Sequence, residues 1–492
     1  MIEITIAQIA LPFFIGFVIY LLPQWGRWLA LAVALVSAVY SLQLFLQPDP
    51  LNIQLLDSFG VSLIADRLSG FFILTNALVT AAVVSYCWST DKTAFFYMQI
   101  IILHGSVNAI FVCADFISLY VALEVISVAA FLLITYPRTD KAIWVGLRYL
   151  FISNTAMLFY LIGALLVYKA NNSFHYEGLL NSPPEAVALI FLGLLAKGGI
   201  FVSGLWLPLT HSESLSPVSA MLSGVVVKAG VFPLVRCALL LPELDPVVRI
   251  FGVGTALLGV FWAMLEKDTK RTLAFSTISQ LGFILAAPVV GGFYALTHGL
   301  VKSALFLIAG ILPSRNFAEL KDRGIDPKIW LVLAIASFSI SGFPLLSGFG
   351  AKILTSKNLL PWQVIAMNVA TVGTVITFAK FIFLPYGRVA LESNEIVKVD
   401  EGKKIQPGFW LAMVILLGGL VGANLVYYEA YTLTNIIKLL VTIVVGWLAY
   451  LFIFKKLALK LPRAIEKLDN LIGVMSLMLI LVFWIVKVRM NI

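Results

Sequence analysis

Long apolar runs alternate with short polar loops along the whole chain. Most runs are about 20 residues long, which is the length of helix that crosses a hydrocarbon core of about 30 Å. They lack the period-two alternation of barrel strands, and a helix satisfies its own backbone polar groups in lipid. The pattern predicts an all-α, polytopic membrane protein with about 14–16 membrane-spanning helices.

Sixteen apolar runs are the candidate spans. They cover residues 3–22, 28–46, 68–88, 94–113, 116–136, 144–168, 184–206, 215–241, 246–265, 272–290, 295–313, 329–355, 362–386, 408–427, 432–454 and 469–486. The longest polar stretch, 387–407, is only a loop, so we expect no soluble domain between the spans. The first run has no basic segment before it and indicates a genuine first span rather than a cleaved signal.

Composition and charge fit a membrane protein. Hydrophobic residues make up 61% of the chain and charged residues 12%, about half the charge of an average soluble protein. The net charge of +9 comes largely from Lys and Arg in short loops, which favours membrane orientation over nucleic-acid binding. The three cysteines are isolated and there is no P-loop or dinucleotide fingerprint, so we expect no metal, disulfide framework or cofactor.

The distribution of basic residues predicts the orientation. Loops after odd-numbered spans carry 20 Lys and Arg residues, whereas loops after even-numbered spans carry 4. Basic loops stay in the cytoplasm, so both termini are expected on the outside.

Several ionisable residues fall inside the predicted spans, where each costs at least a few kcal/mol and is a functional hypothesis. They are Glu124, Arg148, Lys197, Lys228, Arg236, His298, Lys302, Lys352 and Lys380. Arg148, Arg236 and Lys380, with Lys438 near a span end, also fit snorkelling or helix packing. His104 fits a satisfied interior histidine. The mid-span positions of Glu124, Lys197, Lys228 and Lys352 favour function instead.

Two of these lysines lie in spans that glycine and proline interrupt. Lys197 lies in LLAKGGIFVSGLWLP, and Lys352 follows SGFPLLSGFGA. A pair of interrupted spans in corresponding positions is typical of discontinuous helices in inverted repeats. Backbone freed in this way is tolerated only beside protein or a wet cavity. We therefore expect two inverted five-helix repeats, each with one broken helix.

His298 and Lys302 are four residues apart and share a helix face. An imidazole that titrates near neutrality beside a buried amine makes a plausible proton relay. The alternative is a structural histidine that holds a water molecule or the hydroxyl of Thr297 or Ser303.

These motifs resemble, from about residue 100 to residue 385, the antiporter-like membrane subunits shared by Mrp cation/proton antiporters and respiratory complex I. The similar segments are DFISLYVALEVIS (115–127), KGGIFVSGLWLP (197–208), SPVSAMLSGVVVKAGVFPLVR (216–236), DTKRTLAFSTISQLGF (268–283), HGLVKSALFLIAG (298–310) and SGFPLLSGFGAK (341–352). The first segment is more similar to the D-type subunit of Mrp antiporters than to complex I subunits. Leu209 stands where complex I relatives often hold an acid, Leu345 replaces a usual second proline, and Pro233 interrupts the helix after Lys228.

The resemblance implies a domain order and a route. N-terminal helices (1–93) precede a first antiporter-like repeat (94–241), a second repeat (242–386) and C-terminal helices (387–492), whose last part, 430–492, lies beyond the shared core and is a candidate for the docking of other subunits. An ion pair of Glu124 with Lys197 would switch proton binding at that lysine. Protons would then pass to Lys228, through His298 and Lys302, and to Lys352.

Three functions are consistent with these features. The first is a proton-translocating subunit of an antiporter that exchanges sodium or another monovalent cation for protons, without catalytic residues of its own. The second is the proton-pumping, non-redox subunit of a complex I-like quinone oxidoreductase. The third is a scaffolding subunit without conduction. The resemblance implies other membrane subunits as partners, and a bacterial inner membrane or a thylakoid membrane as the location.

Overall fold

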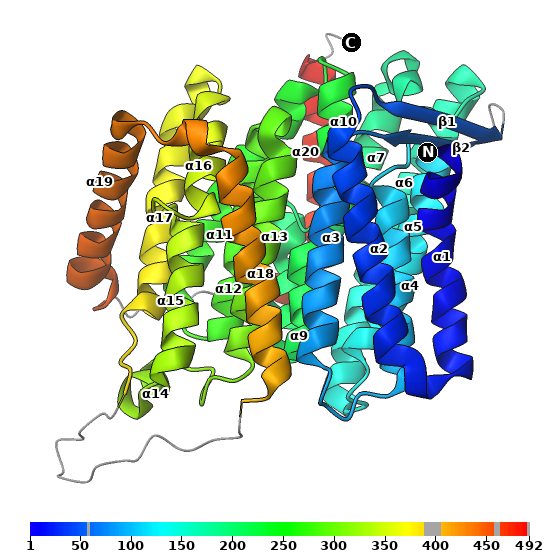
Figure 1. Ribbon diagram of the computed structural model, residues 1–492. Helices are drawn as coiled ribbons and strands as arrows, with labels where there is room; N and C mark the ends of the chain where they lie inside the picture. Colours follow the sequence, from blue (N-terminus) through cyan, green and yellow to red (C-terminus); the bar gives the residue numbers. More distant parts are fainter. Residues whose placement is uncertain (57–59, 388–404, 457–462, 490–492) are drawn as a thin grey trace.

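The computed structural model describes residues 1–56, 60–387, 405–456 and 463–489 as a helical bundle (Figure 1). Its long helices are α1 (Ile2–Leu21), α2 (Gly26–Leu46), α3 (Arg67–Tyr86), α4 (Ala94–Ile110), α5 (Phe116–Ile134), α6 (Asp140–Asn171), α7 (Pro184–Gly198), α10 (Lys228–Leu240), α11 (Asp245–Leu265), α12 (Thr269–Ala286), α13 (Gly291–Ala309), α15 (Pro327–Ser341), α16 (Ser347–Lys357), α17 (Val364–Ile382), α18 (Pro407–Val426), α19 (Leu433–Ala449) and α20 (Leu468–Arg489). Shorter helices are α8 (Leu207–Glu213), α9 (Ser216–Met221) and α14 (Phe317–Arg323).

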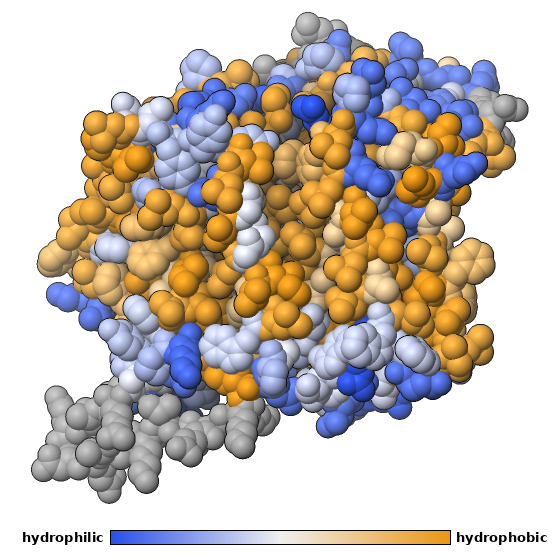
Figure 2. Space-filling model, viewed as in Figure 1, coloured by the Kyte–Doolittle hydropathy of each residue, from blue (hydrophilic) through white to orange (hydrophobic). Residues whose placement is uncertain are grey.

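The predicted all-α membrane architecture is confirmed. In the described ranges, 13 helical segments are long and apolar enough to cross a membrane. The other three predicted spans contain the shorter apolar helices α4 and α15 and the more polar α12. Apolar side chains form a broad band across the visible face, and polar ones gather at both ends (Figure 2). α1 begins and α20 ends on the same side of the bundle (Figure 1), as an even number of spans requires.

Part of the basic loops cannot be placed. The predicted loop 387–407 falls largely outside the described residues, as do the following basic residues that support the orientation: Arg388, Lys398, Lys403, Lys404 and Lys460. The inside–outside assignment therefore stays a prediction.

A two-stranded hairpin was not predicted. β1 (Leu51–Leu56) pairs antiparallel with β2 (Gly60–Ala65) at one end of the bundle (Figure 1). The Ser62 amide donates to Asp115 Oδ2 at 2.8 Å, and the Ile64 amide donates to the Val112 carbonyl at 2.7 Å. A search for runs of about 20 apolar residues misses strands of six residues.

The two predicted broken helices are present. α7 ends at Gly199, whose positive φ of 68° suits glycine, and the chain continues through the 3₁₀ turn η3 (Phe201–Trp206) into α8. The indole of Trp206 donates to the Ala196 carbonyl at 2.9 Å and so satisfies one group that the break frees. α15 ends at Gly342, with φ of 88°, before α16 begins. A further irregularity, the π-helix η4 (Leu222–Val226), joins α9 to α10.

The C-terminal helices pack on both repeats of the predicted core. α18 lies against α3 and α13, and α19 lies against α17. α20 instead packs on α7 and η3, beside the first broken helix. Its start is fixed by polar contacts, because Arg271 pairs with Glu466 Oε1 at 2.6 Å and Arg148 donates to the Glu466 carbonyl.

One ion pair ties two halves of the bundle together. Arg236 on α10 contacts both carboxylate oxygens of Asp66, the N-cap of α3. Burial by itself raises the pKa of the Asp66 carboxyl, but the hydrogen bond and charge of Arg236 outweigh burial and leave that pKa below its ordinary value. The pair therefore stabilises the fold above about pH 4 and loses its effect as the pH falls through the lowered pKa.

We expect Asp66→Asn to lower the free energy of unfolding by about 2 kcal/mol, because it leaves the Arg236 guanidinium without its counter-charge. Thermal unfolding in detergent at pH 7 measures this. Asp49→Asn, at an exposed position, is the control and should change stability by less than about 0.5 kcal/mol. Equal unfolding temperatures for the two variants would contradict this role of the ion pair.

Candidate functional site

All five basic residues predicted for the site are buried: Lys197, Lys228, His298, Lys302 and Lys352. They come from α7, α10, α13 and α16, and two of these helices adjoin the broken segments. Glu124, on α5, is only partly buried. The structure thus places the predicted bases in the interior.

Hydroxyl groups, rather than a carboxylate, hold the Lys197 amine. Its Nζ donates to Ser127 Oγ at 2.5 Å and to Ser153 Oγ at 2.8 Å, and it lies 5.9 Å from the centre of the Tyr149 ring. The two hydroxyls are themselves 3.0 Å apart. Sequence reasoning missed both serines, although Ser127 lies one turn after Glu124 on the same helix.

The implied ion pair between Glu124 and Lys197 is not formed in this structure. Both residues are described, and no Glu124 oxygen lies within 4.0 Å of Lys197 Nζ. The reason is that Ser127 and Ser153 already accept from the amine. Glu124 still acts on Lys197 through its charge.

The π-helix provides the surroundings of Lys228. Lys228 Nζ donates to the Gly224 carbonyl at 2.6 Å and to the Ser223 carbonyl at 3.3 Å. Both carbonyls belong to η4, where the wider π turn takes the place of regular α-helical hydrogen bonding. The amine also lies 3.2 Å from His298 Nδ1. Lys228 and His298 are therefore in direct contact across α10 and α13.

Lys302 lies one turn beyond His298 and turns towards α12. Its amine donates to the Leu273 carbonyl at 3.0 Å and to the Ser276 hydroxyl, and it lies 5.2 Å from the centre of the Phe378 ring. The structure gives no hydrogen bond between Lys302 and His298. The direct contact of His298 is with Lys228.

A small cavity connects His298 with Lys352. It measures about 10 Å³, and its lining includes both residues together with Gln280, Tyr294 and Thr297. Neither His298 Nε2 nor Lys352 Nζ has a hydrogen-bond partner among the described residues. A cavity of this size holds about one water molecule when polar groups surround it. The geometry suits a water-bridged step between the two helices.

A close contact between backbones brings the first broken helix to Lys228. A Cβ at Gly230 would lie 2.3 Å from the Gly198 nitrogen, so α7 and α10 touch where only glycine fits. Gly198 directly follows Lys197, and Gly230 is two residues after Lys228. This crossing therefore fixes the spacing of the two lysines.

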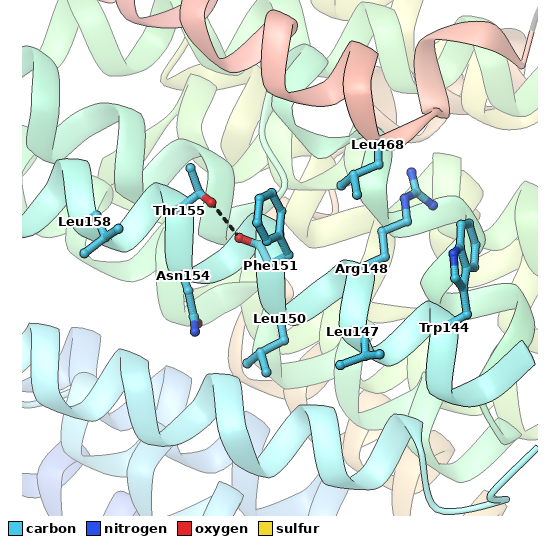
Figure 3. A pocket seen from close by; sticks show the side chains of 9 residues that line it. All are labelled: Trp144, Leu147, Arg148, Leu150, Phe151, Asn154, Thr155, Leu158 and Leu468. Carbon is cyan, nitrogen blue, oxygen red and sulfur yellow. Dashed lines mark hydrogen bonds between the residues drawn. The ribbon is translucent and has the colours of Figure 1, made fainter. Parts of the chain in front are cut away.

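The remaining buried charges serve helix packing. Arg236 pairs with Asp66, and Lys380 donates to three carbonyls, those of Ala263, Met264 and Glu266. Arg148 reaches from α6 towards the start of α20, beside an outward-facing apolar groove of about 550 Å³ (Figure 3). This groove lies apart from the buried amines.

Polar partners surround His104 on both sides. Its Nε2 lies 2.7 Å from Ser37 Oγ, and its Nδ1 lies 3.0 Å from Thr80 Oγ1. It is a satisfied interior histidine. Within the described ranges, no group of three His, Cys, Asp or Glu side chains is placed to hold a metal ion.

A helical membrane bundle with two broken helices and a series of buried amines is typical of proteins that conduct protons or small cations. The family described as NADH:quinone oxidoreductase/Mrp antiporter, transmembrane, matches residues 113–377, more than half of the chain. The chain belongs to this family.

Curated relatives carry two kinds of name. The chain is 27% identical to NAD(P)H-quinone oxidoreductase chain 4 2 of Microcystis aeruginosa, over 75% of this chain and 76% of that protein. It is also 27% identical to the D-type subunit of the Na(+)/H(+) antiporter of Alkalihalophilus pseudofirmus, over 73% and 80% of the two chains.

Solved structures share the fold. A chain of the archaeal membrane-bound sulfane sulfur reductase superposes with a TM-score of 0.74 at 22% identity, covering 90% of this chain and all of that one. A chain of the Mrp complex from Dietzia sp. gives a TM-score of 0.75 at 22% identity, covering 96% and 59%.

We expect Gly230→Ala to lower the unfolding temperature, because the added methyl group forces α7 away from α10 at Lys197 and Lys228. A cost of about 1–3 kcal/mol is typical of such overpacking. Gly418→Ala on α18 is the matched control, since nothing lies within 4 Å of its added Cβ. Thermal unfolding of both variants in detergent tests the contact, and an unchanged Gly230→Ala protein would show that α7 and α10 do not touch there.

Proposed function

We propose that this chain is the proton-translocating membrane subunit of a multi-subunit monovalent cation (Na⁺)/proton antiporter. The observation that carries the proposal is the buried contact of Lys228 with His298, continued by the small cavity to Lys352. Similarity to the D-type subunit of a sodium/proton antiporter supports the choice of complex. Other membrane subunits are its partners, in a bacterial inner membrane or a thylakoid membrane.

The first step of the route takes place at Lys197. Burial disfavours the charged amine, whereas the negative charge of Glu124 favours it. The Ser127 and Ser153 hydroxyls hold the amine in the present arrangement. If the amine moves towards Glu124 it gains a proton, and if it moves back to the hydroxyls it releases one.

The second half of the route runs from Lys228 to Lys352. A proton released at Lys197 passes to Lys228, which contacts His298 Nδ1. The free Nε2 of His298 faces the way to Lys352, so the imidazole takes up a proton on one side and gives it up on the other. One charge that crosses 100 mV gains about 2.3 kcal/mol, which is enough to drive such steps.

The domain division is part of the proposal. Residues 94–241 form a first antiporter-like repeat around the broken α7, and residues 242–386 form a second one around the break between α15 and α16. The corresponding glycine breaks at Gly199 and Gly342 support this division. Helices 1–93 and 387–492 flank the two repeats.

A second candidate is the proton-pumping, non-redox subunit of a complex I-like quinone oxidoreductase. The chain 4 relatives support it, with coverage similar to that of the antiporter relative. A deletion strain separates the two candidates. Lost salt tolerance and lost sodium-dependent proton movement in everted vesicles support the antiporter. Lost quinone-linked oxidation without any loss of cation exchange overturns it.

We expect Glu124→Ala and Lys197→Ala each to abolish proton transport while membrane insertion stays intact, because each removes one member of the first switch. Dye-quench assays in everted vesicles measure transport, and immunoblots of washed membranes measure insertion. Glu185→Ala, which removes an exposed acid, should behave like wild type. Near-wild-type transport in both site variants would refute the proposed route.

A further inference from the structure

His211, on the second part of the first broken helix, has no part in the route described so far. Its side chain is fully buried, and neither ring nitrogen has a hydrogen-bond partner among the described residues. Leaving one buried polar group unpaired costs about 1–3 kcal/mol. His104, equally buried, has both nitrogens paired, so burial alone does not explain His211.

The surroundings of His211 are apolar at contact distance and basic beyond it. Its ring lies 5.5 Å from the Phe306 ring and 6.4 Å from the Trp206 ring, centre to centre. Its charged neighbours are Lys302 and Lys270. Phe306 is one turn beyond Lys302 on α13, so the imidazole lies one turn from the lysine that joins the proposed route.

Lys270 lies on the other side of His211. Its amine donates at 3.0 Å to the carbonyl of Ser214, three residues after His211. On α12, Lys270 precedes by one turn the Leu273 carbonyl that accepts from Lys302. Lys270, His211 and Lys302 therefore succeed one another along one side of α12.

Acidic residues lie between Lys270 and the surface. Glu213 pairs with Lys141 at 2.7 Å and with Arg315 at 3.6 Å, and Asp268 pairs with Arg315 at 2.8 Å. The Glu213 and Asp268 side chains keep 17% and 23% exposure, so both reach solvent. Lys141 and Arg315 belong to loops that the sequence assigns to the cytoplasm.

We propose that His211 relays protons between the Glu213–Asp268 mouth and Lys302, by way of Lys270. This uptake branch rests on the proposed function and adds a cytoplasmic connection to it. The neutral imidazole accepts a proton on one nitrogen and releases the proton of the other, so it stays neutral overall and changes tautomer. Water molecules suit the gaps, because buried polar groups without protein partners are usually hydrated.

A structural role makes a different prediction from a relay. A histidine kept only for packing is replaced at no loss of transport by an apolar residue of similar volume, and such a change removes two unpaired polar atoms. A relay needs a group that can gain and lose a proton near neutral pH, which neither Leu nor Gln provides.

The test uses everted vesicles that contain the full complex with His211→Leu, His211→Gln or His211→Ala. We expect the Leu and Gln variants to lose at least tenfold in proton flux with unfolding temperatures at or above that of wild type. Added imidazole should restore flux in His211→Ala only. His175→Gln, at a partly exposed histidine beside the hairpin, is the control and should transport normally.

Lys197→Ala, measured in parallel, separates the two proposals. Flux within twofold of wild type in His211→Leu and His211→Gln, with flux abolished in Lys197→Ala, overturns the uptake branch and leaves the proposed function standing. Wild-type flux in Lys197→Ala overturns the proposed function. Lost flux in His211→Ala without rescue by imidazole also overturns the relay.

Discussion

The cost of an ionisable group at bilayer depth is the constraint on which the rest of this structure depends. A protonated amine in hydrocarbon needs oxygen atoms to replace water, and a regular helix has few to offer because its carbonyls are already paired. The chain meets this need by departing from the regular helix. The π-helix before Lys228 presents the Ser223 and Gly224 carbonyls, and the break after Lys197 ends a helix beside two hydroxyls.

The buried bases differ in how well they are satisfied. Lys197, Lys228 and Lys302 have oxygen partners, and Lys380 has three, which suits a fixed charge. Lys352 and one nitrogen of His298 have none among the described residues, and His211 has none on either nitrogen. Conduction needs both kinds of site, because a group held too well does not release its proton.

The sequence allowed the spans, the two breaks and the burial of the lysines to be predicted, because run length, glycine and charge are local signals. The hairpin at Leu51–Ala65 escaped because its strands are short. Contacts between helices could not be predicted. Nothing in the sequence shows that Ser127 and Ser153, rather than Glu124, hold Lys197, or that His298 contacts Lys228 rather than Lys302. His211 differs from His104 only in neighbours that the fold supplies.

The most direct measurement of the central claim is proton flux through vesicles that contain the complex with Lys228→Leu. Lys228 is the buried amine in direct contact with His298, between the two halves of the route. The account predicts that flux falls at least tenfold while the complex assembles and unfolds at the temperature of wild type or above. Flux equal to wild type would contradict a path through the buried amines.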